Sequence, residues 1–456
     1  MSRERLGSRL GFILLSAGCA IGIGNVWKFP YMVGQNGGGL FVLIYLFFLL
    51  VMGVPVLTME FAIGRGAQKS PTKMYQELEP EGSKWHIHGI CAVIGNYLLM
   101  MFYTTVAGWM LSYFVSMAKG ELAGLDTKGV SDFFKAMQLD TGSMIFYMAI
   151  VVVLGFVICS IGLQNGLEKI TKVMMIALLV IMVILAINSF LLEGGEEGLA
   201  FYLLPSLERA KKAGLGNVIV AAMNQSFFTL SLGMGAMAIF GSYIGKDRAL
   251  MGEAVNVALL DTFVAFSSGL IMFPACFAYG VEVDSGPSLI FITLPNIFNN
   301  LPMGRLWGSL FFVFMTFAAF STVLTVFEGI LACTMDLFGW SRKKACIING
   351  ICMFLLSLPC VLGYNVLKDV RILGFNIMNF EDFLVSNIFL PLGSLVFILF
   401  CVSKKGWGWN NFVAEANSGK GLKVQKFMRG YITYVLPVIV FVIFAVGIYN
   451  FVLGLK

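Results

Sequence analysis

The chain has 456 residues, of which 58% are hydrophobic and only 12% are charged, and its mean hydropathy is +0.86. Soluble domains carry about 25% charged residues, so a chain this apolar cannot cover a water-facing surface, and its solvent must be lipid. The net charge of +6 is small and spread along the sequence, and nothing in it supports nucleic-acid binding. The nine cysteines lie in or beside apolar stretches without a CxxC pair, which indicates packing thiols and not disulfides or a zinc site.

Eleven segments are apolar enough to cross a bilayer, whose core needs about 20 residues of helix. They are 10–36, 39–63, 88–118, 142–161, 165–192, 215–243, 250–281, 304–336, 343–363, 382–403 and 430–453. We therefore predict an all-α integral membrane protein with one domain, residues 1–456. Its helices fall into a first repeat over 10–192, a second, inverted repeat over 215–403, and an additional helix over 430–453.

Lysine and arginine placement predicts the orientation of these helices. If the amino terminus is cytoplasmic, the inner segments hold twenty of these residues and the outer segments ten. Basic residues are enriched in cytoplasmic loops, so we expect the amino terminus inside. An odd number of helices then places the carboxyl terminus outside.

Glycines interrupt the first and sixth predicted helices at corresponding places. The first contains the run AGCAIGIGN at 17–25, and the sixth contains SLGMG at 231–235. Glycine inside a helix costs about 1 kcal/mol relative to alanine. Close helix packing through small residues is one explanation. Glycines two positions apart lie on different helix faces, however, and two interrupted helices at corresponding positions are typical of a transporter binding site.

The sequence around these glycines resembles the neurotransmitter:sodium symporter family. The resemblance runs through GIGNVWKFP (22–30), NGGG (36–39), MEFAIGR (59–65), QSFFTLSLG (225–233), IFITLP (290–295) and FAAFST (317–322). It implies a sodium-coupled symporter that works by alternating access, with broken helices 1 and 6. Eleven helices resemble the short bacterial branch, which implies a multi-pass protein of the bacterial inner membrane.

The resemblance also implies two sodium sites and a substrate site at the helix breaks. Free carbonyls of an unwound helix suit a hard cation, and free amides suit a carboxylate. Sodium site one would comprise Ala20, Asn25, Thr229 and Asp261, and site two Gly18, Ile21, Ala318, Ser321 and Thr322. The substrate would be held by Ala20, Gly22, Gly24, Leu99, Tyr103, Phe228, Thr229, Ser231, Met234, Thr322, Thr325 and Val326. Taken singly, each Ser or Thr would more often bond to its own helix backbone, and a membrane tyrosine such as Tyr103 would more often be an interface or packing residue.

Asp261 lies deep in an apolar helix, where a carboxylate is expensive and by default functional. Chloride-dependent relatives have a neutral residue at this position and bind an anion nearby. A fixed carboxylate can supply that negative charge, so we expect chloride not to be required. The alternative is a protonated, structural aspartate. Two further acids lie within the predicted membrane helices. The resemblance implies that Glu60 braces the unwound part of helix 6, and Glu328 should pack against a polar partner.

The gates follow from the same resemblance. Tyr103 and Phe228 are expected to form an aromatic lid, with Lys28 and Asp382 as a charged pair above it. Many relatives have arginine where Lys28 stands, and lysine lacks the bidentate fork, so this pair should be a looser latch.

The inner side departs from the family pattern. Arg3 resembles the basic anchor near the amino terminus, but Leu6 replaces its usual tryptophan. Helix 5 has Gly166 without the proline that is common ten residues later, because that position is Ile176. Inner opening by unwinding of helix 5 is therefore in question.

The expected cargo is a hydrophobic L-amino acid. Gly22 stands where amine-selective relatives have an aspartate, which favours a substrate that carries its own carboxylate. Met234 replaces an aromatic residue of the bacterial leucine transporter, and methionine is flexible. We therefore favour aromatic over branched aliphatic cargo, with the latter kept as the alternative.

Two other function classes agree less well with the sequence. A channel or receptor is the main rival, but the polar groups cluster at mid-membrane beneath gates. An enzyme is not expected, because HExxH, GxSxG and phosphate-loop motifs are absent. The partners that we expect are the amino acid, sodium ions and the lipid bilayer, with no obligatory protein partner and no nucleic acid.

Overall fold

The computed structural model describes residues 5–280 and 287–454, and within these ranges the secondary structure consists of helices without a strand. The prediction of an all-α protein is confirmed. Arg3, the expected basic anchor, lies outside the described residues, as does the end of the segment 250–281.

The long helices match the predicted spans to within a few residues, except that the tenth begins five residues earlier. They are Gly39–Ala67 (α3 and α4, joined by a π-helical turn), α6 Ile87–Lys119, α8 Thr141–Ser160, Leu163–Phe190 (a π-helical turn and α9), α14 Leu250–Ala278, α16 Gly304–Phe338, α17 Arg342–Leu362, Ile377–Val402 (α18 Ile377–Phe383, a π-helical turn and α19 Leu390–Val402) and Met428–Tyr449 (α21, a π-helical turn and most of α22). Side chains cap several helix starts, as at Ser8 for α1 and Ser341 for α17.

Short helices lie between the spans, and the sequence pattern had not predicted them. They are α5 Pro71–Leu78, α7 Thr127–Leu139, α10 Glu196–Leu203, α11 Leu207–Ala213, α15 Leu294–Asn300 and α20 Trp409–Ala416. Each is too short or too polar to cross a bilayer alone.

Both predicted helix breaks are present. The first span divides into α1 Arg9–Ala20 and, after a π-helical turn at Gly24–Lys28, α2 Phe29–Gln35, with a bend of 58° between the two parts. The sixth divides into α12 Leu215–Thr229 and α13 Ala236–Tyr243. By length and composition the described residues hold nine spanning helices, or ten with the bent pair. The predicted count of eleven is therefore not confirmed, because the two parts of the sixth segment are each too short to be counted.

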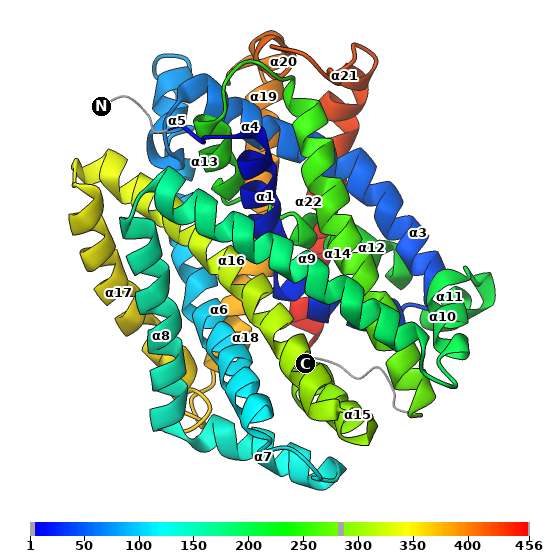
Figure 1. The fold of residues 1–456 in the computed structure, drawn as a ribbon. Coiled ribbons are helices and arrows are strands. Elements are labelled where there is room, and N and C mark those ends of the chain that lie inside the picture. Colours follow the sequence, from blue (N-terminus) through cyan, green and yellow to red (C-terminus); the bar gives the residue numbers. More distant parts are fainter. Residues whose placement is uncertain (1–4, 281–286, 455–456) are drawn as a thin grey trace.

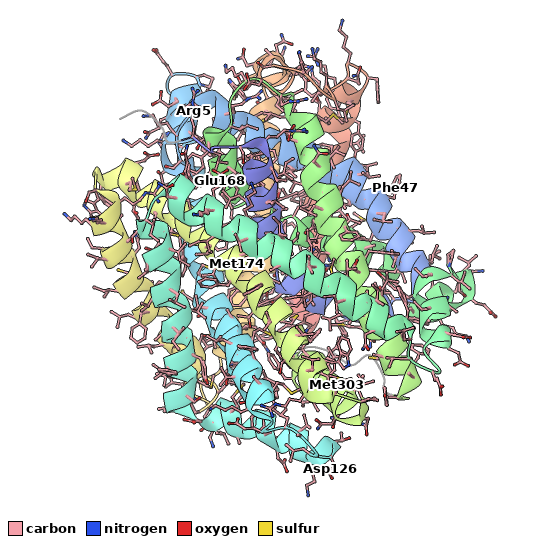
Figure 2. All side chains as sticks on the ribbon, viewed as in Figure 1. Arg5, Phe47, Asp126, Glu168, Met174 and Met303 are labelled. Atoms are coloured by element: carbon pink, nitrogen blue, oxygen red, sulfur yellow. The ribbon has the colours of Figure 1, made fainter. Side chains whose placement is uncertain are left out.

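The broken first helix lies inside the bundle. Helix α1 packs against α9, α13, α14 and α16, while α8, α9 and α17 lie toward the periphery (Figure 1). The outward faces are apolar, as expected for contact with lipid tails. Phe47 on α3, for example, is 60% exposed at the edge of the molecule (Figure 2).

The two ends of the bundle carry different short helices. Helices α5 and α20 lie at one end, together with the start of α1, and α7 and α15 lie at the other (Figure 1). We call these the α5 end and the α7 end. The basic connection at 404–429 is at the α5 end, on the same side as the loop between α4 and α6.

Candidate transport site

A cavity of about 310 Å³ lies where the two helix breaks meet α6, α16 and α18. Its wall includes backbone of both breaks and side chains that are largely apolar. From the predicted site, the wall contains Ala20, Gly22, Gly24, Asn25, Lys28, Leu99, Tyr103, Phe228, Thr229, Ser231, Met234, Thr322 and Asp382. Most residues of the expected substrate site and all four expected gate residues thus surround one space.

Tyr103 of α6 is positioned at the break in helix 1. The backbone N–H of Ile23 donates a hydrogen bond of 3.1 Å to Tyr103 Oη. The hydroxyl therefore keeps its own proton for another acceptor. In the cavity, that proton can be donated to a substrate oxygen.

Two glycines of the break allow this close approach. A Cβ on Gly22 would overlap Tyr103 Oη, and a Cβ on Gly24 would lie 2.8 Å from Phe228 Cε1. No side chain fits at either position without displacing an aromatic residue of the cavity wall. An acidic side chain at Gly22 is therefore incompatible with this arrangement.

Three of the four predicted residues of sodium site one, Asn25, Thr229 and Asp261, form one buried hydrogen-bonded cluster, while Ala20 lies in the cavity wall. Asn25 Nδ2 donates to Asp261 Oδ1 at 2.7 Å, and Thr229 Oγ1 donates to Asp261 Oδ2 at 2.8 Å. Asn25 and Asp261 are 0% exposed and Thr229 is 1% exposed. Asn25 Oδ1 accepts from Gly22 N at 3.2 Å, so half a turn of the amide would present Oδ1 to a cation beside the carboxylate. The set offers amide, hydroxyl and carboxylate oxygens, which suit a hard cation.

The predicted residues of sodium site two also converge. Ser321 Oγ lies 3.2 Å from Gly18 O and 2.9 Å from Ala318 O. Thr322 Oγ1 donates to Ile21 O at 3.1 Å. Three carbonyl and two hydroxyl oxygens thus meet between α1 and α16. Hydroxyls that now donate to these carbonyls could turn their lone pairs toward an ion, so the donor chemistry fits sodium.

Glu60 of α4 contacts the break in helix 6 as expected. The N–H of Gly233 donates to Glu60 Oε1 at 2.5 Å, and Glu60 is fully buried. Gly233 has φ +100° and Ser231 has φ +50°, so this segment cannot continue the helical hydrogen bonds of α12. Glu60 accepts one of the amides left free.

The expected charged gate is not formed as a direct pair. Lys28 and Asp382 both line the cavity, but within the described residues no ion pair joins them. Lys28 Nζ instead lies 3.6 Å from the ring centre of Phe228, and Asp382 Oδ1 accepts from Ser386 Oγ at 2.9 Å. The lysine therefore covers the aromatic lid directly.

The start of α1 is fixed to neighbouring helices at the α5 end. Gly7 N and Ser8 Oγ donate to the two oxygens of Glu168 at 2.7 and 2.9 Å, and Arg9 pairs with Glu253 at 3.0 Å. Figure 2 shows Arg5 and Glu168 toward this same end, where Gln164 Nε2 donates to Arg5 O. These contacts tie the start of α1 to the segments that carry Glu168 and Glu253.

Two predicted substrate residues do not reach the cavity wall. Thr325 and Val326 are buried one turn beyond Thr322 on α16, and Thr325 Oγ1 donates back to Ser321 O and Thr322 O. The wall also contains residues that motif reasoning missed, among them Phe102, Val106, Val385 and Leu390. Leu99, Phe102, Tyr103 and Val106 are spaced so that they share one face of α6. This spacing could have identified Phe102 and Val106.

Comparison with known proteins places this geometry in a family. The model of the Sodium:neurotransmitter symporter family matches residues 3–128 and 127–454. The chain belongs to this family. It is 33% identical over 448 residues to the uncharacterized sodium-dependent transporter YhdH of Bacillus subtilis, covering 97% of this chain and 98% of that protein. It is 30% identical over 455 residues to an uncharacterized sodium-dependent transporter of Haemophilus influenzae, covering 97% of each.

A solved structure of the symporter family is similar throughout. The crystal structure of MhsT in complex with L-phenylalanine has a TM-score of 0.87 and 38% sequence identity, covering 97% of this chain and 99% of MhsT. As a member of the sodium:neurotransmitter symporter family, the chain is a multi-pass membrane transporter coupled to sodium and not an enzyme.

Proposed function

We propose that this transporter imports a hydrophobic, preferably aromatic, L-amino acid together with two sodium ions. The observation that carries the proposal is the juxtaposition at the helix-1 break. Tyr103 Oη, the peptide groups of 22–24 and the apolar wall around Leu99 and Met234 surround one cavity. One end suits a carboxylate and the other a hydrophobic side chain.

The absence of an acid at the break supports an amino acid and not a monoamine. Gly22 cannot carry a side chain beside Tyr103, so the cavity has no acidic group there to hold an amine. The substrate must therefore bring its own carboxylate. MhsT, which is similar over nearly its whole length, was solved with L-phenylalanine, and this favours aromatic cargo over the branched aliphatic alternative.

Two clusters of oxygen ligands support two coupled ions. With a zwitterionic substrate, two sodium ions carry two net charges inward. At about 2.3 kcal/mol per charge per 100 mV, the membrane potential then supplies roughly 4.6 kcal/mol. Since about 1.4 kcal/mol is tenfold in an equilibrium constant, this permits accumulation on the order of a thousandfold.

The buried carboxylate of Asp261 supports independence from chloride. It lies within 3 Å of Asn25 and Thr229, so its charge would compensate a sodium ion at site one directly.

We place the α5 end, with its basic 404–429 connection, in the cytoplasm of a bacterial inner membrane. The amino terminus is then inside and the carboxyl terminus outside.

Uptake into proteoliposomes tests the proposal. A labelled panel of phenylalanine, tyrosine, tryptophan and leucine should accumulate only with an inward sodium gradient, and faster with a negative interior. Replacing chloride by gluconate should change nothing. Equal uptake when potassium replaces sodium on both sides would exclude the symporter mechanism.

A further inference from the structure

The side chain of Met234 sits in the cavity wall on a backbone that has little local support. Its neighbours Gly233 and Gly235 have φ values of +100° and +72°, and the segment lies between α12 and α13. Met234 is nonetheless 2% exposed and lines the cavity. Its position must therefore be fixed by contacts from other helices.

One such contact comes from Asn96 of α6. Asn96 Nδ2 donates a hydrogen bond of 3.1 Å to the carbonyl oxygen of Met234, and Asn96 is fully buried. A buried amide that satisfies a carbonyl freed by the helix break has a net stabilising effect, because leaving that carbonyl without a partner would be costly. Asn96 thus holds the Met234 backbone by its carbonyl oxygen, while Glu60 accepts from the N–H of the preceding residue, Gly233.

The second contact comes from the preceding residue, Gly95. A Cβ at this position would lie 3.1 Å from Met234 Sδ, 3.4 Å from Met234 Cγ and 3.0 Å from Phe389 Cδ1. The space that this glycine leaves is filled by the thioether of Met234 together with the ring of Phe389. Methionine is unbranched and its far end moves easily, so an added methyl group would displace it. The cavity offers the displaced side chain room to move.

Gly95 and Asn96 themselves do not belong to the cavity wall. On the same helix, Leu99 follows Gly95 by four residues and Tyr103 follows Asn96 by seven. Leu99 and Tyr103 do line the cavity. We propose that Gly95 and Asn96 are positioning residues that set the depth of the substrate side-chain pocket through Met234. This inference rests on the proposed amino-acid transport and names what decides between large and small hydrophobic cargo.

Gly95→Ala provides the direct test. One added methyl group should push Met234 into the pocket. The affinity for phenylalanine and tryptophan, measured by competition binding, should then fall on the order of tenfold, as expected for a pocket changed by one methylene. The affinity for leucine should change less than threefold. The higher helix propensity of alanine should offset part of the crowding between its Cβ and the Phe389 ring. Gly216→Ala is the matched control, because a Cβ there meets nothing within 4 Å and should leave both affinities unchanged.

A double variant separates displacement of Met234 from general damage. In a Met234→Ala background the thioether is gone, so Gly95→Ala should no longer change the ratio of phenylalanine to leucine affinity. The same shift of that ratio with and without Met234 would overturn the proposal. An unchanged ratio in Gly95→Ala alone would also overturn it.

Asn96→Leu tests the second residue with a side chain of similar size that cannot donate. Release of the Met234 carbonyl should let the side chain spread over several positions, so the phenylalanine-to-leucine ratio should fall about threefold while sodium dependence is kept. An unchanged phenylalanine-to-leucine affinity ratio in this variant would show that Asn96 does not position Met234. Failure of the proposed function is distinguishable, because it would show as absent sodium-dependent amino-acid binding in the unmodified protein.

Discussion

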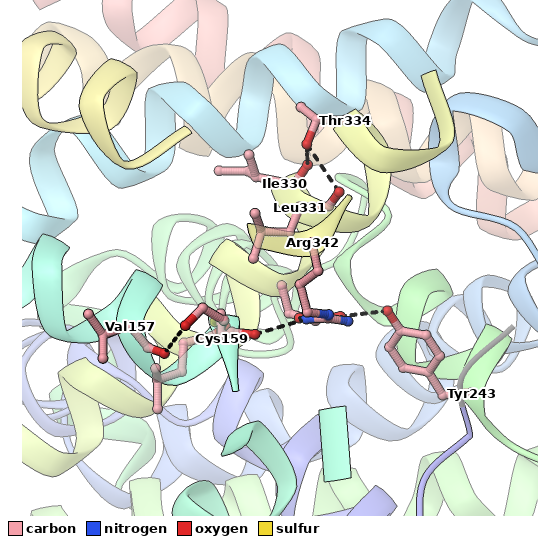
Figure 3. Close-up of polar contacts among 10 residues, drawn as sticks. Val157, Cys159, Tyr243, Ile330, Leu331, Thr334 and Arg342 are labelled. Atoms are coloured by element: carbon pink, nitrogen blue, oxygen red, sulfur yellow. Dashed lines mark hydrogen bonds and ion pairs between the residues drawn. The ribbon is translucent and has the colours of Figure 1, made fainter. Parts of the chain in front are cut away.

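Arg342, at the first position of α17, forms a two-pronged ion pair with Glu328 of α16, at 2.7 Å from Nη1 to Oε2 and 3.0 Å from Nη2 to Oε1. Glu328 is fully buried and also accepts from Tyr243 Oη at 2.8 Å. Arg342 Nη1 further donates to the carbonyl of Cys159, and Figure 3 shows the guanidinium between Cys159 and Tyr243. The polar partner expected for Glu328 is thus present, and it ties together α8, α13, α16 and α17.

Glu328→Gln should therefore destabilise the protein strongly. Removing one member of a buried ion pair leaves an uncompensated charge, which typically costs about 3–5 kcal/mol. The melting temperature in detergent should drop clearly. The control is Asp132→Asn, which removes an exposed pair with Lys135 and should change little. An equal drop in melting temperature for the two substitutions would show that the buried pair contributes no more to stability than the exposed pair.

Glu168→Ala should weaken substrate binding from a distance. Its carboxylate accepts two hydrogen bonds from the start of α1, and hydrogen bonds to a charged group contribute about 1.5–3 kcal/mol each. If this contact closes the α5 end, which we propose to be cytoplasmic, its loss favours the open state and lowers the population that binds substrate.

Labelled amino-acid binding in saturating sodium measures this shift. Affinity should fall about tenfold or more, with substrate selectivity unchanged. Glu197→Ala, an exposed acid on α10, is the control and should bind normally. Normal affinity in Glu168→Ala would contradict a role in closure.

Glu79, in the connection between α5 and α6, predicts a pH dependence of stability. Partial burial alone would raise the pKa of this carboxyl, but hydrogen bonds from Ser83 Oγ at 2.6 Å and from the His86 side chain and backbone hold the pKa below its usual value of 4.5. A depressed folded pKa means that this stabilisation is present above pH 4.5 and is lost as the pH falls through the lower, folded value.

Melting temperatures of the unmodified protein and Glu79→Gln, measured from pH 7 down to pH 4, test this expectation. The gap between the two should be widest at neutral pH and narrow toward pH 4. A gap that stays constant over this range would assign the effect to packing and not to charge.

The spans and both breaks could be predicted because bilayer thickness fixes helix length and because glycine pairs are costly inside helices. The residues of the two proposed sodium sites followed from motif resemblance, and hydrogen bonds join all of them except Ala20 in the structure. Other features depend on tertiary contacts that no local pattern encodes. The Lys28 ammonium lies over Phe228 and not beside Asp382, and Thr325 turns back onto its own helix. Val385 and Leu390 also line the cavity, and no motif in their segment distinguishes them from lipid-facing apolar residues.

The surroundings of Asp261 bear on the proposed independence from chloride. Tyr45 is close enough to interact electrostatically with Asp261 and Thr229, and Gln225 is one helical turn before Thr229 on α12. Among the described residues, Tyr45 Oη and both polar atoms of the Gln225 side chain are buried without a hydrogen-bond partner. Buried donors without partners beside a cation site could hold an anion if the fixed carboxylate were removed.

Asp261→Asn keeps an oxygen ligand and removes the charge. Sodium affinity should fall on the order of tenfold or more, because a charged ligand contributes more than a neutral one. Chloride should then partly restore sodium-dependent binding relative to gluconate, whereas the unmodified protein should not distinguish the two anions. Protons should compete with sodium only where the carboxylate is present, so inhibition at low pH should weaken in the variant.

Tyr45→Phe in the Asp261→Asn background decides whether any chloride effect is local. Removing the hydroxyl should abolish the rescue, since one of the two candidate donors is lost, while Tyr45→Phe alone should leave sodium affinity nearly unchanged. Substrate binding as a function of sodium, in chloride and in gluconate, measures all four proteins. Chloride dependence in the unmodified protein, or an unchanged sodium requirement in Asp261→Asn, would remove Asp261 from the ion site.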